Sequence, residues 1–264
     1  MNKIQALFKL KGKTKEENYL VKEEKIRYLF NRIRRVFKKI PYFTMGETLE
    51  KPIIAINSYG LFSCRRRTYD LHIISDSYEF YLRKLFEKLS KKAKVLVDVG
   101  AHIGKYAILA SKLNPHAKVF AVEPGKENFK FLSKNKTLNE LNNLKIIKLA
   151  LHNKKGKVKL YLGEVNTGGQ GIEGFVPNSN KFEVVRQDTF DNVFGKKLDK
   201  IDLVKIDTEG NESEILKGAH NFLYNKKIKN IIFELNGQET KKLLESYGYS
   251  CKKIQSNNYL ASIK

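Results

Sequence analysis

From Lys94 onward, short apolar runs alternate with longer segments whose apolar residues recur every three or four positions. The runs are rich in Val and Ile, which is typical of strands buried on both faces; they cover 94–99, 118–123, 144–151, 201–207 and 229–235. The segments with helical periodicity are 105–113, 126–141, 212–224 and 239–247. This alternation predicts an α/β fold in which helices cover both faces of a parallel sheet.

Additional strands are predicted at the end of the chain and beside the third strand. Residues 249–255 and 259–264 flank Ser256-Asn257-Asn258, so we expect an antiparallel hairpin there. Residues 156–163 read as an added ribbon strand. The whole pattern predicts a Rossmann-like, seven-stranded, mostly parallel sheet with a C-terminal antiparallel hairpin.

The N-terminal part has a different character. Its first 40 residues hold 13 Lys and Arg against 4 Glu, and residues 23–40 have helical periodicity up to Pro41. The apolar positions of this helix are Ile26, Leu29, Phe30, Ile33, Phe37 and Ile40. We expect this stripe either to pack on the rest of the protein or to rest on a membrane, while RNA binding would use the basic residues alone.

A basic N-terminal extension over 1–90 is therefore predicted before a second domain over 91–264. Between 52 and 75 we expect short strands, with Ser58-Tyr59-Gly60 as a turn and 64–74 as a basic strand, followed by a helix over 77–90.

Charge and cysteine content narrow the class of protein. The net charge of +23 and the pI near 9.8 favour nucleic acid, an anionic membrane or phosphorylated substrates as partners, although a solvated Lys-rich surface explains them equally well. Cys64 and Cys251 have no paired spacing, so neither a disulfide framework nor a cysteine zinc site is expected. With no long apolar run, we expect a cytoplasmic protein that is free or peripheral at the inner face of the membrane.

The turn after the run at 94–99 carries the candidate chemistry. Gly100 and Gly104 suit a close approach of backbone to ligand, but His102 breaks the dinucleotide pattern G-x-G-x-x-G. Asp98 would repel a pyrophosphate by about 1 kcal/mol or more. The same carboxylate suits the sulfonium and amino group of S-adenosylmethionine (SAM). Glu123 ends the next strand, where a carboxylate can accept hydrogen bonds from both ribose hydroxyls.

Five segments in this order resemble the FkbM family of SAM-dependent methyltransferases: VDVGAHIGKYA, AVEPGKENFKFLSKN, LALHNKKGKVKLY, VKIDTEGNESEILKGA and IIFEL. The resemblance covers 95 to about 236, and it implies the class I methyltransferase fold, SAM as cofactor and methylation of a hydroxyl. His102 stands where the family commonly has Asn, and both can donate a hydrogen bond. With Asp98, Gly100, Gly104 and Glu123, we assign to the cofactor site Ala101, His102, Pro124, Asn128, Ala150 and Leu151.

Candidate catalytic carboxylates stand at two later strand ends. Asp207 and Glu209 flank Thr208 after the fourth core strand, and Glu234 ends the following strand. A carboxylate there can take the proton of a hydroxyl acceptor, or it can cap a helix or face solvent. Two neighbouring carboxylates can also hold a divalent ion, but without a third ligand we predict no metal. Residues 163–182 are rich in Gly and Asn and are expected to form a lid over the acceptor site or a plain surface loop.

The leading hypothesis is a SAM-dependent O-methyltransferase for a glycan, glycolipid or related metabolite. The alternative is an RNA methyltransferase that uses the basic surface, with Tyr69 among the arginines of 65–67 available for base stacking. A non-catalytic binding protein with the same fold is less consistent with the intact set of Asp98, Glu123 and Asp207.

Overall fold

A seven-stranded sheet forms the centre of the computed structural model, which describes residues 2–37, 44–163, 171–172, 180–234 and 238–263. The strand order is β13-β14-β12-β11-β4-β5-β6. The five strands from β12 to β6 are parallel, whereas β14 pairs antiparallel with both β12 and β13. The predicted class I methyltransferase fold, with its C-terminal antiparallel hairpin, is confirmed.

The elements of this sheet follow the predicted ranges closely. Its strands are β4 Val95–Val99, β5 Lys118–Val122, β6 Leu144–Ile147, β11 Ile201–Ile206, β12 Ile228–Glu234, β13 Tyr249–Gln255 and β14 Asn258–Ile263. Its helices are α5 Lys105–Leu113, α6 Lys126–Leu138, α7 Phe190–Phe194, α8 Glu212–Lys217, α9 His220–Tyr224 and α10 Glu239–Ser246.

Two hydrophobic cores lie on opposite faces of the sheet. Neighbouring residues of β4 point to different cores, since Leu96 belongs to the core with α5 and α6, and Val97 to the core with α7–α10. A strand buried on both faces needs a continuous apolar run, which explains the absence of polar alternation in the sequence.

Where the sequence predicted one helix over 212–224, the chain forms α8 and α9. The break is at Gly218 and Ala219, whose ψ angles of −6° and 23° leave the helical range. The chain is closely packed there, since a Cβ at Gly218 would lie 2.2 Å from the carbonyl oxygen of His152. The predicted single helix is wrong in this respect.

A second sheet, with the strand order β7-β10-β8-β9, lies beside the first. It consists of β7 Ala150–Leu151, β8 Gly156–Tyr161, β9 Gly171–Ile172 and β10 Phe182–Asp188. The strand predicted over 144–151 is therefore split between two sheets. Of the predicted lid over 163–182, residues 164–170 and 173–179 lie outside the described residues.

The N-terminal extension contains α1 Lys3–Phe8, β1 Lys11–Gly12, α2 Lys15–Phe37, β2 Ile53–Ile56, β3 Leu61–Cys64, α3 Asp70–Ile74 and α4 Phe80–Ser90. Strands β1, β2 and β3 form a small antiparallel sheet. Its buried side chains join those of α5 and β4 in one core. The division into 1–90 and 91–264 stays a prediction.

Two predictions for the extension are wrong. The basic strand over 64–74 is a strand end, a turn and helix α3, because Asp70 accepts hydrogen bonds from Arg65 and pulls the chain into a turn. The helix predicted over 23–40 is present as α2, but its predicted start is wrong, because α2 begins at Lys15; residues 38–40 lie outside the described residues.

No described helix is long and apolar enough to cross a bilayer.

Candidate active site

The turn between β4 and α5 brings together the residues predicted to hold the cofactor. The backbone N–H groups of Gly100 and Ala101 both donate to the carbonyl oxygen of Val122, which fixes the turn against the end of β5. Gly100 has φ +78°, and a Cβ there would lie 1.9 Å from the carbonyl oxygen of Asp207. Glycine is therefore required at position 100 by the close approach of β11.

Glycine at position 104 is explained by packing against a helix rather than by the approach of β11. Its φ is +98°, and a Cβ would lie 2.7 Å from Cδ1 of Leu132 on α6. Gly104 lines neither of the two cavities described below. Its assignment to the cofactor remains a prediction, because packing of α5 against α6 is enough to explain glycine there.

One cavity lies at the carboxyl ends of β4 and β5, where ligands of open parallel sheets bind. It is lined by Val99, Gly100, His102, Val122, Glu123, Pro124, Asn128, Leu149, Ala150, Leu151, Leu160, Ile172, Asp207, Thr208 and Asn211. We call it the nucleoside cavity. Seven of the ten residues predicted to hold the cofactor contribute to this wall, and apolar side chains from β7, β8 and β9 close its other side.

Glu123 is the buried carboxylate of the nucleoside cavity. Its Oε2 accepts from the backbone N–H of His102 at 2.8 Å, and Oε1 accepts from that of Gly125 at 2.9 Å. Burial raises the pKa of Glu123 to about 7, although these hydrogen bonds favour the charged form. Each carboxylate oxygen has two lone pairs, so Oε2 can still accept a hydroxyl of a ribose, whereas Oε1 also has the Asn128 amide at 3.4 Å, which a second hydroxyl would have to replace.

Asp98 provides the second test of whether SAM fits. Its carboxylate is buried, and no hydrogen bond of normal geometry reaches either oxygen from the described residues, although the Ala107 amide weakly favours the charged form. Burial raises the pKa of Asp98 to about 6. A buried carboxylate without donors is costly, and a cationic ligand relieves that cost. The residues present therefore fit the amino and sulfonium groups of SAM.

A larger cavity of about 330 Å³ adjoins the same turn on the side of the N-terminal extension. We call it the acceptor cavity. Its lining comprises Thr44, Tyr69, His72, Ile73, Tyr78, Glu79, Asp98, Gly100, Ala101, His102, Lys105, Tyr106, Lys205, Asp207, Glu209 and Glu234. All three carboxylates predicted to be catalytic thus meet in one space, with Asp98 in its wall.

Asp207 lies at the end of β11 and is paired with a buried lysine. Nζ of Lys205 donates to Oδ2 of Asp207 at 2.7 Å and lies 4.6 Å from the ring centre of Tyr106. Burial would lower the pKa of Lys205, but the neighbouring Asp207, Asp98 and Glu79 outweigh it and hold the ammonium charged. The pair gives the acceptor cavity a fixed cation and a fixed hydrogen-bond acceptor.

Glu209 and Glu234 are two carboxyl groups of the acceptor cavity whose pKa values lie near neutral pH. Burial, reinforced by the negative charge of Asp207, raises the pKa of each to about 7. Glu209 also has φ +54°, an uncommon conformation for a residue other than glycine. Such a conformation at a cavity wall is typical of a functional residue.

Among the Lys, Asp and Glu residues that line this cavity, the sequence analysis missed three. Lys205 had a signal, since a lysine inside the apolar run 201–207 must find a buried partner. Lys105 donates from Nζ to the carbonyl oxygen of Tyr78 at 3.1 Å, and burial lowers its pKa to about 7. Glu79 accepts from the hydroxyl of Tyr106 at 2.8 Å, and burial raises its pKa. Only the tertiary structure brings these two to the site.

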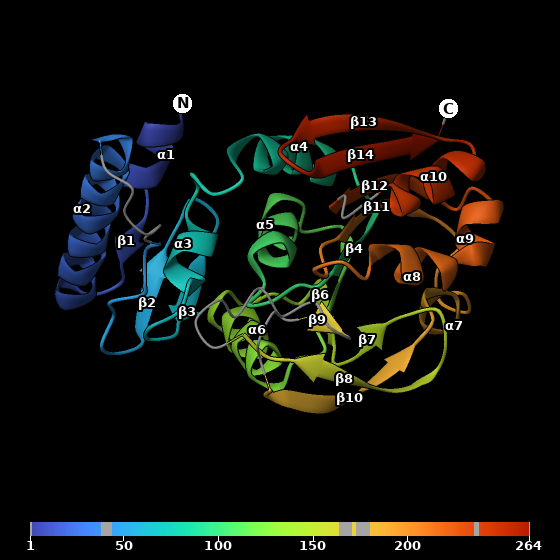
Figure 1. Cartoon of the computed structure of the whole chain (residues 1–264), viewed down its shortest axis with the longest axis horizontal. Helices are drawn as coiled ribbons and strands as arrows, with labels where there is room; N and C mark the ends of the chain where they lie inside the picture. Colours follow the sequence, from blue (N-terminus) through green and yellow to red (C-terminus); the bar gives the residue numbers. More distant parts are fainter. Residues whose placement is uncertain (1, 38–43, 164–170, 173–179, 235–237, 264) are drawn as a thin grey trace.

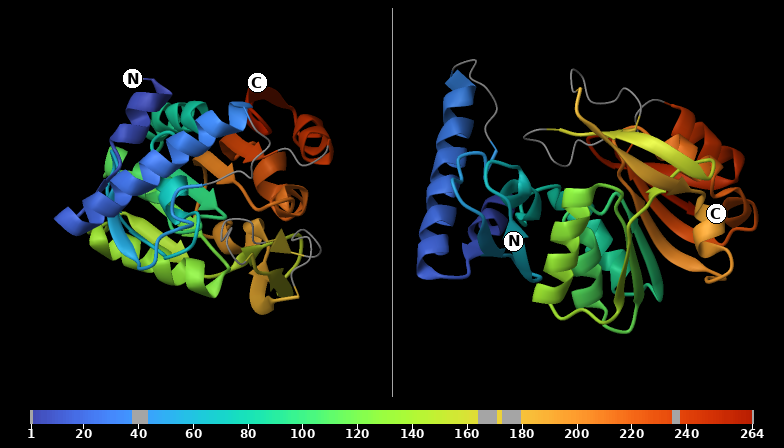
Figure 2. Two further views of the ribbon diagram at one scale, coloured as in Figure 1. Left: turned by 60° about the vertical axis from the view of Figure 1, so that its left-hand side comes forward. Right: turned by 90° about the horizontal axis from the view of Figure 1, so that it is seen from below.

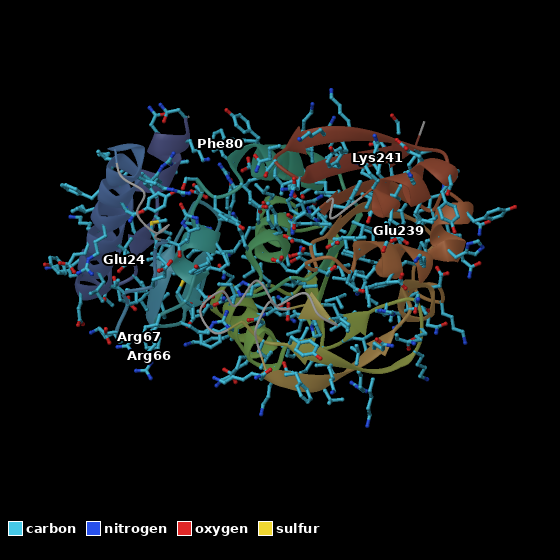
Figure 3. The ribbon with its side chains drawn as sticks, viewed as in Figure 1. Glu24, Arg66, Arg67, Phe80, Glu239 and Lys241 are labelled. Atoms are coloured by element: carbon cyan, nitrogen blue, oxygen red, sulfur yellow. The ribbon has the colours of Figure 1, made fainter. Side chains whose placement is uncertain are left out.

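Arg65 connects the N-terminal extension to the nucleoside cavity. Its guanidinium forms two hydrogen bonds to Asp70, at 2.8 and 2.7 Å, and a third to Oδ1 of Asn128 at 2.8 Å. The following Arg66 and Arg67 are exposed and lie at the outer surface (Figure 3). Of these three arginines, Arg65 is therefore engaged inside the protein.

No group of three or more His, Cys, Asp or Glu side chains suited to a metal ion occurs within the described part of the chain. In the acceptor cavity, Asp207 is paired with Lys205, and Lys105 lines the same space.

Residues 98–259 match the family model of the methyltransferase FkbM domain, which is more than half of the chain. The chain belongs to the FkbM methyltransferase family. Its cofactor is accordingly SAM, which agrees with the fit of Asp98 and Glu123.

A methyltransferase of the fungus Sordaria araneosa, sdnD, is 29% identical over 154 residues, which are 47% of this chain and 60% of that protein. The chain thus spans about 60% of the length of this curated relative. Two solved structures are similar at low identity. Precorrin-6y C5,15-methyltransferase from Geobacter metallireducens is 16% identical, with 69% of this chain and 88% of that chain covered and a TM-score of 0.43. An O-methyltransferase from Bacillus cereus is 13% identical, with 72% of this chain and 82% of that chain covered and a TM-score of 0.43.

Proposed function

We propose that this protein transfers a methyl group from SAM to a hydroxyl group of a carbohydrate, either a free glycan or a glycolipid. The observation that carries the proposal is the acceptor cavity, in which Glu209 and Glu234 stand with Asp207 and Lys205 beside the cofactor turn. A hydroxyl needs a proton acceptor when it becomes a nucleophile, and these carboxyls have pKa values of about 7.

The lining of the acceptor cavity suits a sugar in particular. Carboxylates accept hydrogen bonds from hydroxyls, and lysines donate to hydroxyl oxygens. Tyr69, Tyr78 and Tyr106 add aromatic rings to the same wall, against which the C–H faces of a sugar ring can pack. The cavity thus combines many charged hydrogen-bonding groups with aromatic rings, which suits a ligand with many hydroxyl groups.

Bound SAM supplies the activated methyl group. The chain's own part is to hold the acceptor oxygen in line with that carbon, which is the larger share of catalysis in such a displacement. We assign the proton of the acceptor hydroxyl to Glu209, and we assign a hydrogen bond to the acceptor to Asp207, which Lys205 holds in place. Glu234 contributes a further hydrogen bond to the sugar.

An RNA acceptor is less well supported. Arg65, the first arginine of the predicted RNA-binding stretch, is bonded to Asp70 and Asn128, so its guanidinium is committed within the protein. Tyr69 lines the acceptor cavity rather than an outer surface suited to stacking. RNA methylation therefore enters the test below as the competing outcome.

The test is to incubate the protein with methyl-labelled SAM and three separate acceptor pools: small sugars, lipid-linked glycans and protein-free RNA. We expect label in a carbohydrate pool and its loss in a Glu209→Gln variant. Label that is stable to mild base but released with the methylated sugar would identify an ether. Label only in RNA would overturn the carbohydrate proposal, and label in none would remove both.

A further inference from the structure

Helix α2 carries an apolar stripe that faces away from the protein. Tyr19, Ile26, Phe30 and Ile33 are exposed by 62%, 56%, 63% and 59%. They lie seven, four and three residues apart, which at about 3.6 residues per turn places them on one face of the helix. Four large apolar side chains in one row form a patch rather than scattered exposure.

The opposite face of α2 is the one that packs on the protein. Val21, Glu24, Lys25 and Tyr28 are buried there. Oε2 of Glu24 accepts from the backbone N–H of Gly46, and Nζ of Lys25 donates to the carbonyl oxygens of Phe8 and Leu10. The helix is thus held by its inner face, so the exposed stripe is not needed for packing.

Figures 1 and 2 show α2 at the outer edge of the molecule, beyond the small N-terminal sheet, with one long side open. The structure divides the predicted stripe: Leu29 packs against the core, whereas Ile26, Phe30 and Ile33 are exposed. Ile40 and the side chain of Phe37 lie outside what the structure describes.

The charge around Ile26, Phe30 and Ile33 has a single sign, whereas the Tyr19 end of the stripe carries acidic residues, and the Tyr19 hydroxyl donates to Glu23 at 2.9 Å. From Lys25 to Gly46 the sequence has seven Lys or Arg and no Asp or Glu. Lys22 and Arg27 are exposed on either side of the stripe. A row of apolar side chains with basic residues on its flanks is the pattern of a helix that lies in the headgroup region of an anionic bilayer.

We propose that α2 rests with the stripe of Tyr19, Ile26, Phe30 and Ile33 on an anionic lipid surface. The apolar row and its basic flanks together favour a membrane over RNA or a second copy of this chain. RNA would attract the basic residues but would leave the apolar row in water. A second copy of α2 would cover the row but would bring two strongly basic segments together, which like charges oppose. An anionic membrane satisfies both the row and its charged flanks.

This surface stands near the acceptor cavity. Tyr28 on the buried face of α2 has its ring centre 5.3 Å from that of His72, which lines that cavity. A protein docked through α2 would therefore hold the acceptor cavity close to the lipid headgroups. The docking itself does not depend on which acceptor is methylated.

The test is co-sedimentation of the full chain with vesicles of phosphatidylcholine, alone or mixed with phosphatidylglycerol. The test variant is Ile26→Ser/Phe30→Ser/Ile33→Ser. The matched control is Tyr81→Ser/Val184→Ser/Tyr224→Ser, which removes three other exposed apolar side chains, on α4, β10 and α9. Thermal melting of each variant checks the fold.

We expect the wild-type chain and the control to bind the mixed vesicles, and the test variant to bind at least about tenfold more weakly with an unchanged melting temperature. Lys22→Gln/Arg27→Gln should also weaken binding and reduce its dependence on salt. Equal binding by test variant and wild type would overturn the proposal. A wild-type dimer that the test variant makes monomeric, without vesicle binding, would assign the stripe to a second copy instead.

Discussion

Nη2 of Arg65 lies 3.0 Å from Nε2 of His102. This contact joins the N-terminal extension to the turn that carries the cofactor residues. Burial lowers the pKa of His102 to about 4, so its ring is neutral near pH 7 and Nε2 can accept from the guanidinium. Arg65 also bonds Asn128, whose amide lies 3.4 Å from Glu123. We therefore interpret Arg65 as a positioning residue for the nucleoside cavity.

Replacing Arg65 should reduce both stability and SAM affinity. Arg65→Ala leaves Asp70 buried and without its main partner, which typically costs about 3–5 kcal/mol of unfolding free energy. The double variant Arg65→Ala/Asp70→Ala should recover much of that stability while SAM affinity, measured by calorimetry, stays low. Arg66→Ala, at an exposed neighbour, is the control. Full recovery of SAM affinity in the double variant would reduce Arg65 to a structural residue.

Glu123→Ala should weaken SAM by about 1.5–3 kcal/mol, roughly 10- to 150-fold in Kd, the range for hydrogen bonds to a charged group. The reason is the loss of the carboxylate that faces the nucleoside cavity. Glu127→Ala on the exposed side of α6 is the matched control. Calorimetry that finds the same Kd for Glu123→Ala and wild type would remove the ribose assignment.

Asp207→Asn should lower kcat/KM for the acceptor by about 10- to 100-fold, because a charged hydrogen-bond acceptor becomes neutral while its shape is kept. Lys205 then also loses the negative charge of its 2.7 Å partner, although the amide oxygen can still accept a hydrogen bond. Asp199→Asn, at an exposed position before the same strand, is the control for general effects of charge. Initial rates with labelled SAM would check this, and unchanged kinetics would leave Asp207 with a structural role.

The pH dependence of activity should follow Glu209. Its pKa of about 7 means that the base form increases as pH rises through neutrality, so the rate should rise there and then level off. Glu209→Gln should remove this rising limb and lower kcat by about 10²–10⁴-fold. Glu234→Gln should mainly raise KM and keep the limb. If the rising limb of the pH–rate profile disappears in Glu234→Gln but not in Glu209→Gln, the base is Glu234, and Glu209 binds the acceptor.

The same raised pKa has a consequence for stability. A carboxyl whose pKa is higher in the folded than in the unfolded state binds extra protons when folded, so its contribution to the free energy of unfolding falls as pH rises from about 4.5 to about 7. In thermal melts without cofactor, the melting temperature of Glu209→Gln should rise relative to that of wild type as the pH increases from about 4.5 to about 7. For a protein of this size the difference should be a few degrees at most.

Gly100→Ala should destabilise the protein and abolish SAM binding, since the new Cβ would lie 1.9 Å from the carbonyl oxygen of Asp207. The alternatives are a shifted turn or a shifted β11, and both disturb the two cavities. Gly156→Ala is the control, because Gly156 also has a positive φ but its Cβ would meet nothing nearer than 3.9 Å. Similar SAM binding in both variants would show that the turn adapts to the added methyl.

The main sheet was predictable because a strand buried on both faces must be an apolar run, and the runs here, except those at 144–151 and 201–207, are separated by segments with helical periodicity. Once the strands were assigned, the residues at their carboxyl ends could be assigned as well. Asp98, Glu123, Asp207 and Glu234 end or follow parallel strands, and the carboxyl ends of such strands meet at one edge. Sequence alone therefore determined the fold class and the side of the sheet on which the chemistry lies.

What the sequence could not determine depends on contacts between distant segments. The role of Gly100 rests on β11, more than 100 residues away, and Glu79 and Lys105 reach the acceptor cavity only through the packing of α4 against α5. The periodicity of α2 predicted an apolar stripe but not which face is buried. Both its apolar and its polar residues can find partners in the extension, and the buried Glu24 and Lys25 are satisfied by backbone groups that no local pattern indicates.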